Sequence, residues 1–405
     1  MTELLVGNGF DLHHKFPTRY IDFLQTLQFL IANYDESITT VGHVFGHKAL
    51  QEQNEFISEC YDKHNHVYNS TQLPKEVIIE IITTASENMW FTYLCKCVSE
   101  NIHWIDFEKE IIRVLDAFDA FFNEEGGLTL SHNRVFFDLN GFPSDREHRY
   151  VISNFTFFCE ESNDGWTGRS KIMYIKDNYV LEEITGSNYY RLAIENIAAV
   201  LYDSLRSLSN ILRDYLHYFI DVPAQEYANS GVKPFFKSLP TSNRVYSFNY
   251  TNTLEILYNN SMVDHIHGNT CTEIVLGINP NDNDEVGNVD TTFLQFKKYF
   301  QRVFFKTDNS FLDRMSAIRR TPHIKDRRLY VVGHSLDSTD EDIIKQIFST
   351  SNSIWILYHN EISVKNQIKN LVQIYGKEGF DHLREAKDLQ FLPQSDICWK
   401  SIEDT

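Results

Sequence analysis

Residues 4–11 read LLVGNGFD, a short apolar run that stops at two glycines separated by one asparagine. Such a run is typical of a buried strand, and the glycines are typical of a tight turn. Pro17 then opens a pattern of apolar residues at helical spacing that continues to Leu27. The start of the chain therefore predicts a strand, a turn and a helix, in that order.

The same alternation of strands and helices returns in the carboxyl part of the chain. Strand patterns occur at residues 245–248, 265–267, 274–278, 329–332, 354–358 and 389–392, and helical patterns at 253–258, 340–348 and 364–375. Strands that alternate with helices predict a parallel sheet with helices on both faces. We therefore expect an α/β fold with a Rossmann-like parallel sheet that is split in sequence. Its nucleotide-binding domain comprises residues 1–31 and 240–405.

Residues 32–239 are expected to form a large, mostly helical insertion. Residues 32–75 are polar and predict long loops with short helices, whereas 75–122 and 189–220 carry helical patterns. Between them, β-branched and aromatic runs are separated by turn residues, which predicts β-hairpins near 132–180. The runs of this hairpin region are Arg134–Leu139, Tyr150–Cys159 and Lys171–Ile175.

The composition narrows the classes of function. The 405 residues include 37 Lys and Arg against 56 Asp and Glu, which gives a net charge of −19. This balance opposes binding to nucleic-acid backbones, and no apolar run approaches the roughly 18–20 residues that span a bilayer. Six scattered cysteines and an amino terminus without signal-peptide features indicate the cytoplasm. We expect neither a membrane nor a nucleic acid as partner.

The first candidate binding motif is Gly7-Asn8-Gly9-Phe10-Asp11, between the first strand and the first helix. Glycines let the backbone approach a pyrophosphate, and amides at a helix start supply positive potential. The motif departs from GxGxxG because position 12 is Leu. The alternative interpretation is a tight turn without a ligand.

Two further motifs carry the candidate catalytic residues. Asn249 follows a predicted strand, so it is expected at the carboxyl edge of the sheet, where ligands of open α/β sheets bind. His267 precedes Gly268, which removes a side chain from the approach to the imidazole, and it is a candidate general base. Alternation along a strand would put His265 and His267 on one face. The alternatives are that Asn249 only satisfies backbone groups and that His267 is structural.

The last motif is Gly333-His334-Ser335, in which Ser335 could meet a ribose or a phosphate. A rival interpretation is the nucleophile elbow GxSxG of α/β-hydrolases, with Asp340 and His359 completing a triad. Asp337 stands at the position of its last glycine. A cluster of Cys60, His64 and His66 has metal-capable side chains, but the spacing matches no common zinc pattern. We expect no metal and read this cluster as a polar surface loop.

Taken together, these motifs resemble the AbiH family of bacterial phage-resistance (abortive infection) proteins. The resemblance rests on GNGFDL (7–12), WIDFE (104–108), FNYTNTLE (248–255), IHG (266–268), LGIN (276–279) and VVGHSL (331–336). More distantly, they are similar to the sirtuin-like NAD-consuming domains of antiphage systems. Asp11 departs from that pattern, which usually has Ser, and the paired cysteines of deacetylating sirtuins are absent, so protein deacylation is disfavoured.

The resemblance implies NAD as the substrate, cleaved at its nicotinamide–ribose bond. His267 would be the base, Asn249 would orient the water or the ribose, the Gly7–Gly9 amides would hold phosphates, and Ser335 would bind the adenosine side. A phage-derived trigger or partner protein and a homo-oligomer are compatible with this function. Two alternatives remain open: a nucleotide-sensing or partner-binding module without turnover, and a hydrolase that uses Ser335.

Overall fold

The structure is a computed structural model, and it describes most of the chain. The described residues are 1–100, 105–125, 137–138, 145–155, 157–162, 171–175, 181–183, 190–230, 244–259, 262–279, 291–320 and 327–394. They form two compact units. The first consists of the described residues within Met1–Ile82, Asn210–Val275 and Gln301–Thr405, and the second of those within Thr83–Ser209 and Leu276–Phe300. The domain bounds expected from the sequence stay a prediction.

A six-stranded, all-parallel sheet lies in the first unit, with strand order β11-β10-β9-β1-β7-β8. Its strands are β1 (Thr2–Val6), β7 (Arg244–Ser247), β8 (Val263–His265), β9 (Arg328–Val332), β10 (Ser353–Tyr358) and β11 (Asp388–Pro393). The amino-terminal strand β1 pairs with β7 on one side and with β9 on the other. The predicted α/β class with a parallel sheet is therefore confirmed.

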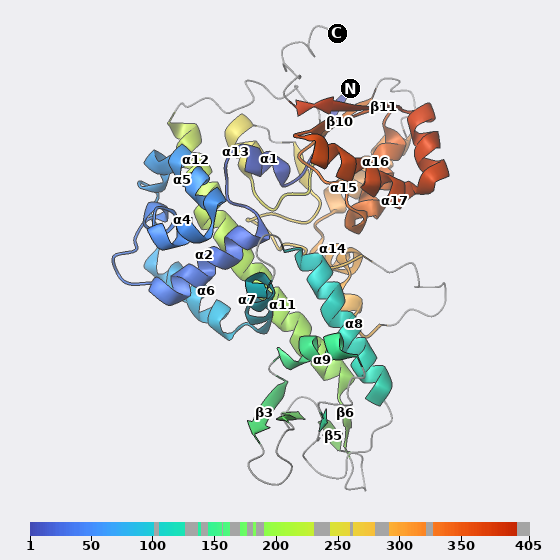
Figure 1. The fold of residues 1–405 in the computed structure, drawn as a ribbon. Helices are drawn as coiled ribbons and strands as arrows, with labels where there is room; N and C mark the ends of the chain where they lie inside the picture. Colours follow the sequence, from blue (N-terminus) through green and yellow to red (C-terminus); the bar gives the residue numbers. More distant parts are fainter. Residues whose placement is uncertain are drawn as a thin grey trace. The chain divides into compact units, whose positions relative to one another are not determined.

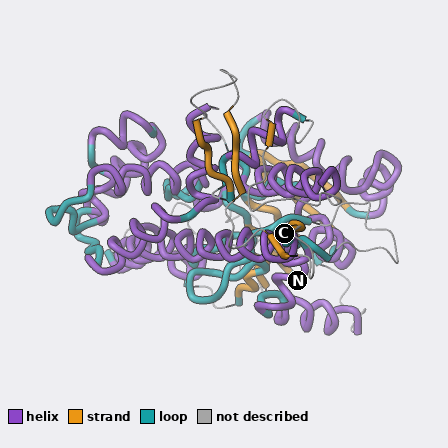
Figure 2. The backbone as a smooth tube through the Cα atoms, turned by 90° about the horizontal axis from the view of Figure 1, so that it is seen from below, coloured by secondary structure: helices purple, strands orange, loops and turns teal. Residues whose placement is uncertain are grey.

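Helices make up most of the remaining backbone (Figure 2). The α-helices are α1 (Gly9–His13), α2 (Tyr20–Asn33), α3 (Val41–Phe45), α4 (Lys48–Gln53), α5 (Glu55–Tyr68), α6 (Lys75–Glu87), α7 (Met89–Glu100), α8 (Phe107–Glu125), α9 (Arg146–Ser153), α11 (Ile194–Leu216), α12 (Val222–Asn229), α13 (Thr253–Tyr258), α14 (Lys298–Phe305), α15 (Asn309–Arg320), α16 (Glu341–Thr350) and α17 (Glu361–Ala386). Shorter helical turns are the π-helix η1 (His217–Asp221) and the 3-10 helices η2 (Leu294–Phe296) and η3 (Ser338–Asp340).

Alternating side chains of β1 enter two separate apolar cores, as expected for a strand that is covered on both faces. Leu5 belongs to the core that β9, β10 and the helices α15–α17 share, and Figure 1 shows these helices around β10 and β11. Leu4 and Val6 belong to the other core, together with Phe10 of α1 and Leu254 of α13. The apolar run that starts the chain is therefore buried on both sides.

The second unit holds two small antiparallel sheets, β2-β4-β3 and β5-β6. Their strands are β2 (Phe137–Asp138), β3 (Phe158–Ser162), β4 (Lys171–Ile175), β5 (Leu181–Glu183) and β6 (Tyr190–Leu192). The strand expected at Tyr150–Cys159 is wrong over its first part, because α9 runs to Ser153 and Asp145 caps that helix by accepting from two backbone amides. Residues 134–136 and 139 of the first expected strand lie outside the described residues.

Three other expectations are wrong. Residues 55–68 form the 14-residue helix α5 rather than a polar loop, because Asn54 caps it and Ile57, Cys60, His64 and Val67 make a buried stripe at helical spacing. The expected strand at 265–267 ends at His265, and the one at 274–278 is reduced to a single bridge at Ile278. His265 and His267 therefore do not share the face of one strand.

Candidate functional site

The glycines of the first and last motifs interlock at the carboxyl edge of the sheet. The Gly7 amide donates to the carbonyl of Val332 over 3.0 Å, and the Gly9 amide donates to the carbonyl of Gly333 over 2.8 Å. Gly333 has φ +65°, and a Cβ there would lie 2.2 Å from the nitrogen of Phe10. Glycine is needed here because two backbone turns are in direct contact. The Gly7 and Gly9 amides serve this contact.

Asp11 lies in α1, directly after this turn, and its side chain faces the loop after β7. Its side chain accepts hydrogen bonds from the hydroxyls of Thr251, over 2.6 Å, and of Thr253. Only 1% of the residue is exposed. Burial, opposed by these two bonds, raises the pKa of Asp11 to about 7. The carboxyl therefore ties the turn after β1 to the turn after β7.

Asp221 makes the next link along the edge. It ends the π-helix η1 and accepts from the backbone amide of Asn252 over 3.0 Å, from the Asn252 side chain over 2.9 Å, and from Thr270 over 2.5 Å. Burial, opposed by these bonds, raises the pKa of Asp221 to about 6. Single π-turns within helices are frequent at functional sites. Asp221 thus joins the loop after β7 to the loop after β8.

His265 lies between two hydrogen-bond acceptors. Its Nδ1 is 3.0 Å from the backbone oxygen of Asn249, and its Nε2 is 2.5 Å from Oε1 of Glu255. Two acceptors around one ring favour the doubly protonated imidazolium. Burial lowers the pKa of His265, but the bond and charge of Glu255 outweigh it and the net shift is upward.

Asn249 has its own side chain at this edge. The residue is 7% exposed, and its carboxamide oxygen Oδ1 is buried without a hydrogen-bond partner. A buried acceptor without a donor costs stability, and such atoms need an explanation such as a ligand or a bound water. Asn249 is therefore the strongest sign of a ligand among the sequence-predicted catalytic residues.

His267 lies two residues after the end of β8 and is held by Asp340. Its Nε2 is 2.9 Å from Oδ1 of Asp340, and both residues are buried. Phe248 packs against the rings of His267 and His334, with centroid distances of 5.4 and 4.4 Å. Gly268 has φ +76°, and a Cβ there would lie 1.9 Å from the carbonyl oxygen of Glu273. The tight turn at Gly268 therefore fixes the backbone position of His267.

Two predicted residues are more exposed than the rest. The Asn8 side chain accepts from the Thr18 hydroxyl over 2.5 Å, at the surface. Ser335 is exposed, and the positive-φ positions of its turn are Gly333 and Leu336, on either side of it. A nucleophile elbow puts the strain at the serine itself. This geometry disfavours the Ser335 hydrolase.

The structure thus brings the four sequence motifs together through contacts at one edge of the sheet. Sequence reasoning missed Asp221 and the bond between Asp11 and the two threonines. Asp221 lies in a long helical pattern, and its partners are far away in sequence, so no local signal points to it. Among the described residues, no group of three or more His, Cys, Asp or Glu side chains could hold a metal.

The fold and site define an α/β protein of the class whose ligands bind at the carboxyl edge of a parallel sheet. The family model for bacteriophage abortive infection AbiH matches residues 4–359. The chain therefore belongs to the AbiH family, and the resemblance noted in the sequence is confirmed. Comparisons with curated proteins and with solved structures give no match. None of the described helices is both long enough and apolar enough to cross a membrane.

Proposed function

We propose that this protein acts in phage abortive infection by hydrolysing NAD, or a related nucleotide, at the carboxyl edge of its sheet. Family membership supports the role in phage defence. Counted along the chain, the strand order is 3-2-1-4-5-6, the order of Rossmann-type sheets that bind dinucleotides. In such sheets the ligand lies where the order reverses, which here is between β1 and β9.

Two observations carry the proposal: the pair of His267 and Asp340, and the buried Asn249, whose side-chain oxygen has no hydrogen-bond partner. Asp340 holds Nε2 of His267 and favours the tautomer in which Nδ1 is the basic nitrogen. Nicotinamide leaves from NAD with little acid assistance, because the bond that breaks bears a positive charge on its nitrogen. The reaction then needs a base and an oriented water or ribose hydroxyl. His267 supplies the first, and Asn249 the second.

The glycine turns have a different role from the one that the motif suggests. The Gly7 and Gly9 amides donate to carbonyls of the turn after β9. In this proposal the two amides hold the turns after β1 and β9 together where the strand order reverses, and they do not bind the pyrophosphate. Ser335 has an exposed hydroxyl at the same edge, where it would meet the adenosine ribose.

The test measures nicotinamide release from NAD by the purified protein, with and without phage components. His267→Ala should lower the rate by about 10²–10⁴, the usual effect of losing a general base. Asp340→Asn should lower it less, because the base remains but loses its orientation. His382→Ala is the matched control, since His382 is exposed on α17. Protection against phage, measured by plating on cells that carry each variant, should fall in the same order as the rate of nicotinamide release.

A folded His267→Ala protein that still protects cells would remove NAD hydrolysis at this site as the mechanism. It would favour a nucleotide-sensing module without turnover. Folding is checked by circular dichroism and size exclusion, since the substitution removes no large apolar side chain.

A further inference from the structure

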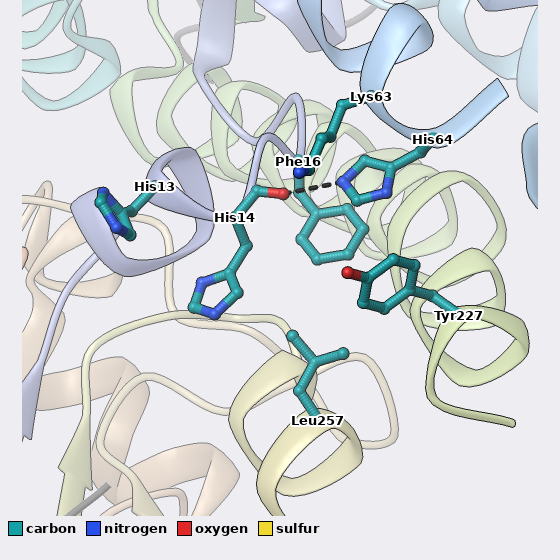
Figure 3. A pocket seen from close by; sticks show the side chains of 7 residues that line it. All are labelled: His13, His14, Phe16, Lys63, His64, Tyr227 and Leu257. Atoms are coloured by element: carbon teal, nitrogen blue, oxygen red, sulfur yellow. Dashed lines mark hydrogen bonds between the residues drawn. The ribbon is translucent and has the colours of Figure 1, made fainter. Parts of the chain in front are cut away.

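A small cavity lies beside α1 and α5, within the first unit, and none of its lining residues belongs to the candidate site described above. Its volume is ≈ 60 Å³, and His14, Phe16, Lys63, His64 and Tyr227 are among its lining residues (Figure 3). No carboxylate lines it. The chain as a whole has a net charge of −19, whereas the only formally charged side chain among the described residues that line this cavity is the lysine Lys63.

His64 occupies an unusual position in α5. Its backbone has φ −120° and ψ 16°, so the helix is kinked at this residue. The helix contains neither proline nor glycine, which are common causes of a kink, so another local interaction is responsible. The kink places the His64 ring flat on Phe16, with centroids 5.0 Å apart and planes at 4°. His64 is 2% exposed.

The hydrogen bonds of His64 fix its tautomer. Its Nε2 is 2.8 Å from the carbonyl oxygen of His14, and a carbonyl can only accept, so Nε2 carries the proton. Burial lowers the pKa of His64 to about 4, and the ring is neutral at pH 7. Nδ1 therefore holds a lone pair, and this buried atom has no hydrogen-bond partner.

The neighbouring His14 cannot donate to this lone pair, because both of its nitrogens are engaged. Its Nδ1 is 2.8 Å from the carbonyl oxygen of Phe10, and its Nε2 is 2.8 Å from the hydroxyl of Tyr258. The first bond requires a proton on Nδ1, so Nε2 accepts from the tyrosine. His14 therefore does not serve the His64 lone pair, and a donor that enters the cavity would satisfy it.

We propose that this cavity binds hydrogen phosphate, which still carries an O–H at neutral pH. The group must bring an O–H to Nδ1 of His64, and negative charge suits the ammonium of Lys63, which Figure 3 shows extending from α5 toward the same space. The cavity is well below the roughly 150 Å³ that hold a benzene ring, so only a group of a few atoms enters. A protonated oxyanion meets all three conditions.

The test compares phosphate with sulfate, which has the same shape but no O–H at neutral pH. Titration calorimetry on the full chain should show phosphate binding at least about tenfold more tightly than sulfate, since one hydrogen bond is lost. His64→Gln keeps a donor for the His14 carbonyl but removes the Nδ1 acceptor, so it should abolish the preference. Lys63→Gln should weaken both anions alike, and Lys48→Gln, an exposed control on α4, should change neither.

Adenosine monophosphate is a second comparison ligand: its phosphate, with a second pKa of about 6, is mostly without an O–H at neutral pH, so it should bind more weakly than free phosphate. Equal affinity for sulfate and phosphate in the wild type would overturn the proposal, as would a lack of phosphate binding. If His64→Gln fails to fold, the anion preference of the wild type and the loss in Lys63→Gln decide the matter. The readout is binding, so it is independent of NAD turnover.

Discussion

Replacing Asp11 by Asn should stabilise the protein at neutral and alkaline pH. Burial, against the bonds from Thr251 and Thr253, raises the pKa of Asp11 from 3.8 to about 7. The unfolded chain therefore loses this proton near pH 3.8, whereas the folded chain keeps it until about pH 7. The contribution of the carboxyl to stability is complete below the lower value and is lost as the pH rises through the higher one.

The size of the loss follows from the two pKa values. The difference between about 7 and 3.8 is about 3 pH units. Each unit corresponds to about 1.4 kcal/mol, which gives about 4 kcal/mol in total and about 3 kcal/mol between about pH 5 and about pH 8. Asn does not titrate, and it can accept from one threonine hydroxyl and donate to the other. Asp11→Asn should lack this loss.

Urea unfolding at the two pH values measures the free energy of unfolding for the wild type and the variant. The wild type should lose about 3 kcal/mol more than Asp11→Asn on going to the higher pH. Asp381→Asn is the control, because Asp381 is exposed on α17, and its pH profile should match the wild type. Parallel profiles for the wild type and Asp11→Asn would refute the reasoning, since they would mean that burial does not raise this pKa.

Two more substitutions test the backbone and the opposite edge of the sheet. Gly333→Ala should destabilise the protein by more than the about 1–3 kcal/mol of strain alone, because its Cβ would also lie 2.2 Å from the Phe10 nitrogen. Gly376→Ala isolates the strain, since φ is +67° there with no atom within 4 Å, and equal losses in thermal unfolding would contradict the close contact. Arg327→Ala should cost about 3 kcal/mol in urea unfolding, because it leaves the buried Glu3, 2.6 Å away, without its main partner. A loss below about 1 kcal/mol would show that this pair behaves like an exposed one.

The sheet was predictable from the sequence because its strands are marked locally. The apolar run before Gly7 and the one before Gly333 each end at a glycine, and both are strands of the observed sheet. The helix α5 was hidden, because only a few residues of 55–68 are buried and most of the others are polar. Such a helix is recognised from one narrow stripe of buried residues, which the average composition of the segment does not reveal.

The site was predictable in part, for a physical reason. Asn249 and His267 follow strands, so a parallel sheet brings them to the same edge whatever lies between them in the chain. How far a strand extends is a different matter. Alternation over three residues could not show that β8 stops at His265, since the end depends on the turn at Gly268 and on the bond from the Ile266 amide to the carbonyl of Ser247. Contacts between distant loops leave no local pattern.

The two edges of the sheet differ in how they handle buried charge, and the difference favours the carboxyl edge as the functional one. At the amino edge, Glu3 is matched by the guanidinium of Arg327. At the carboxyl edge, Asp11 and Asp221 are buried among hydroxyls and amides, and burial raises the pKa of both. These carboxyls cost stability at neutral pH, yet they join successive loops of the edge. Buried polar networks of this kind fix one loop geometry, and proteins retain such costs mainly where a site needs that geometry.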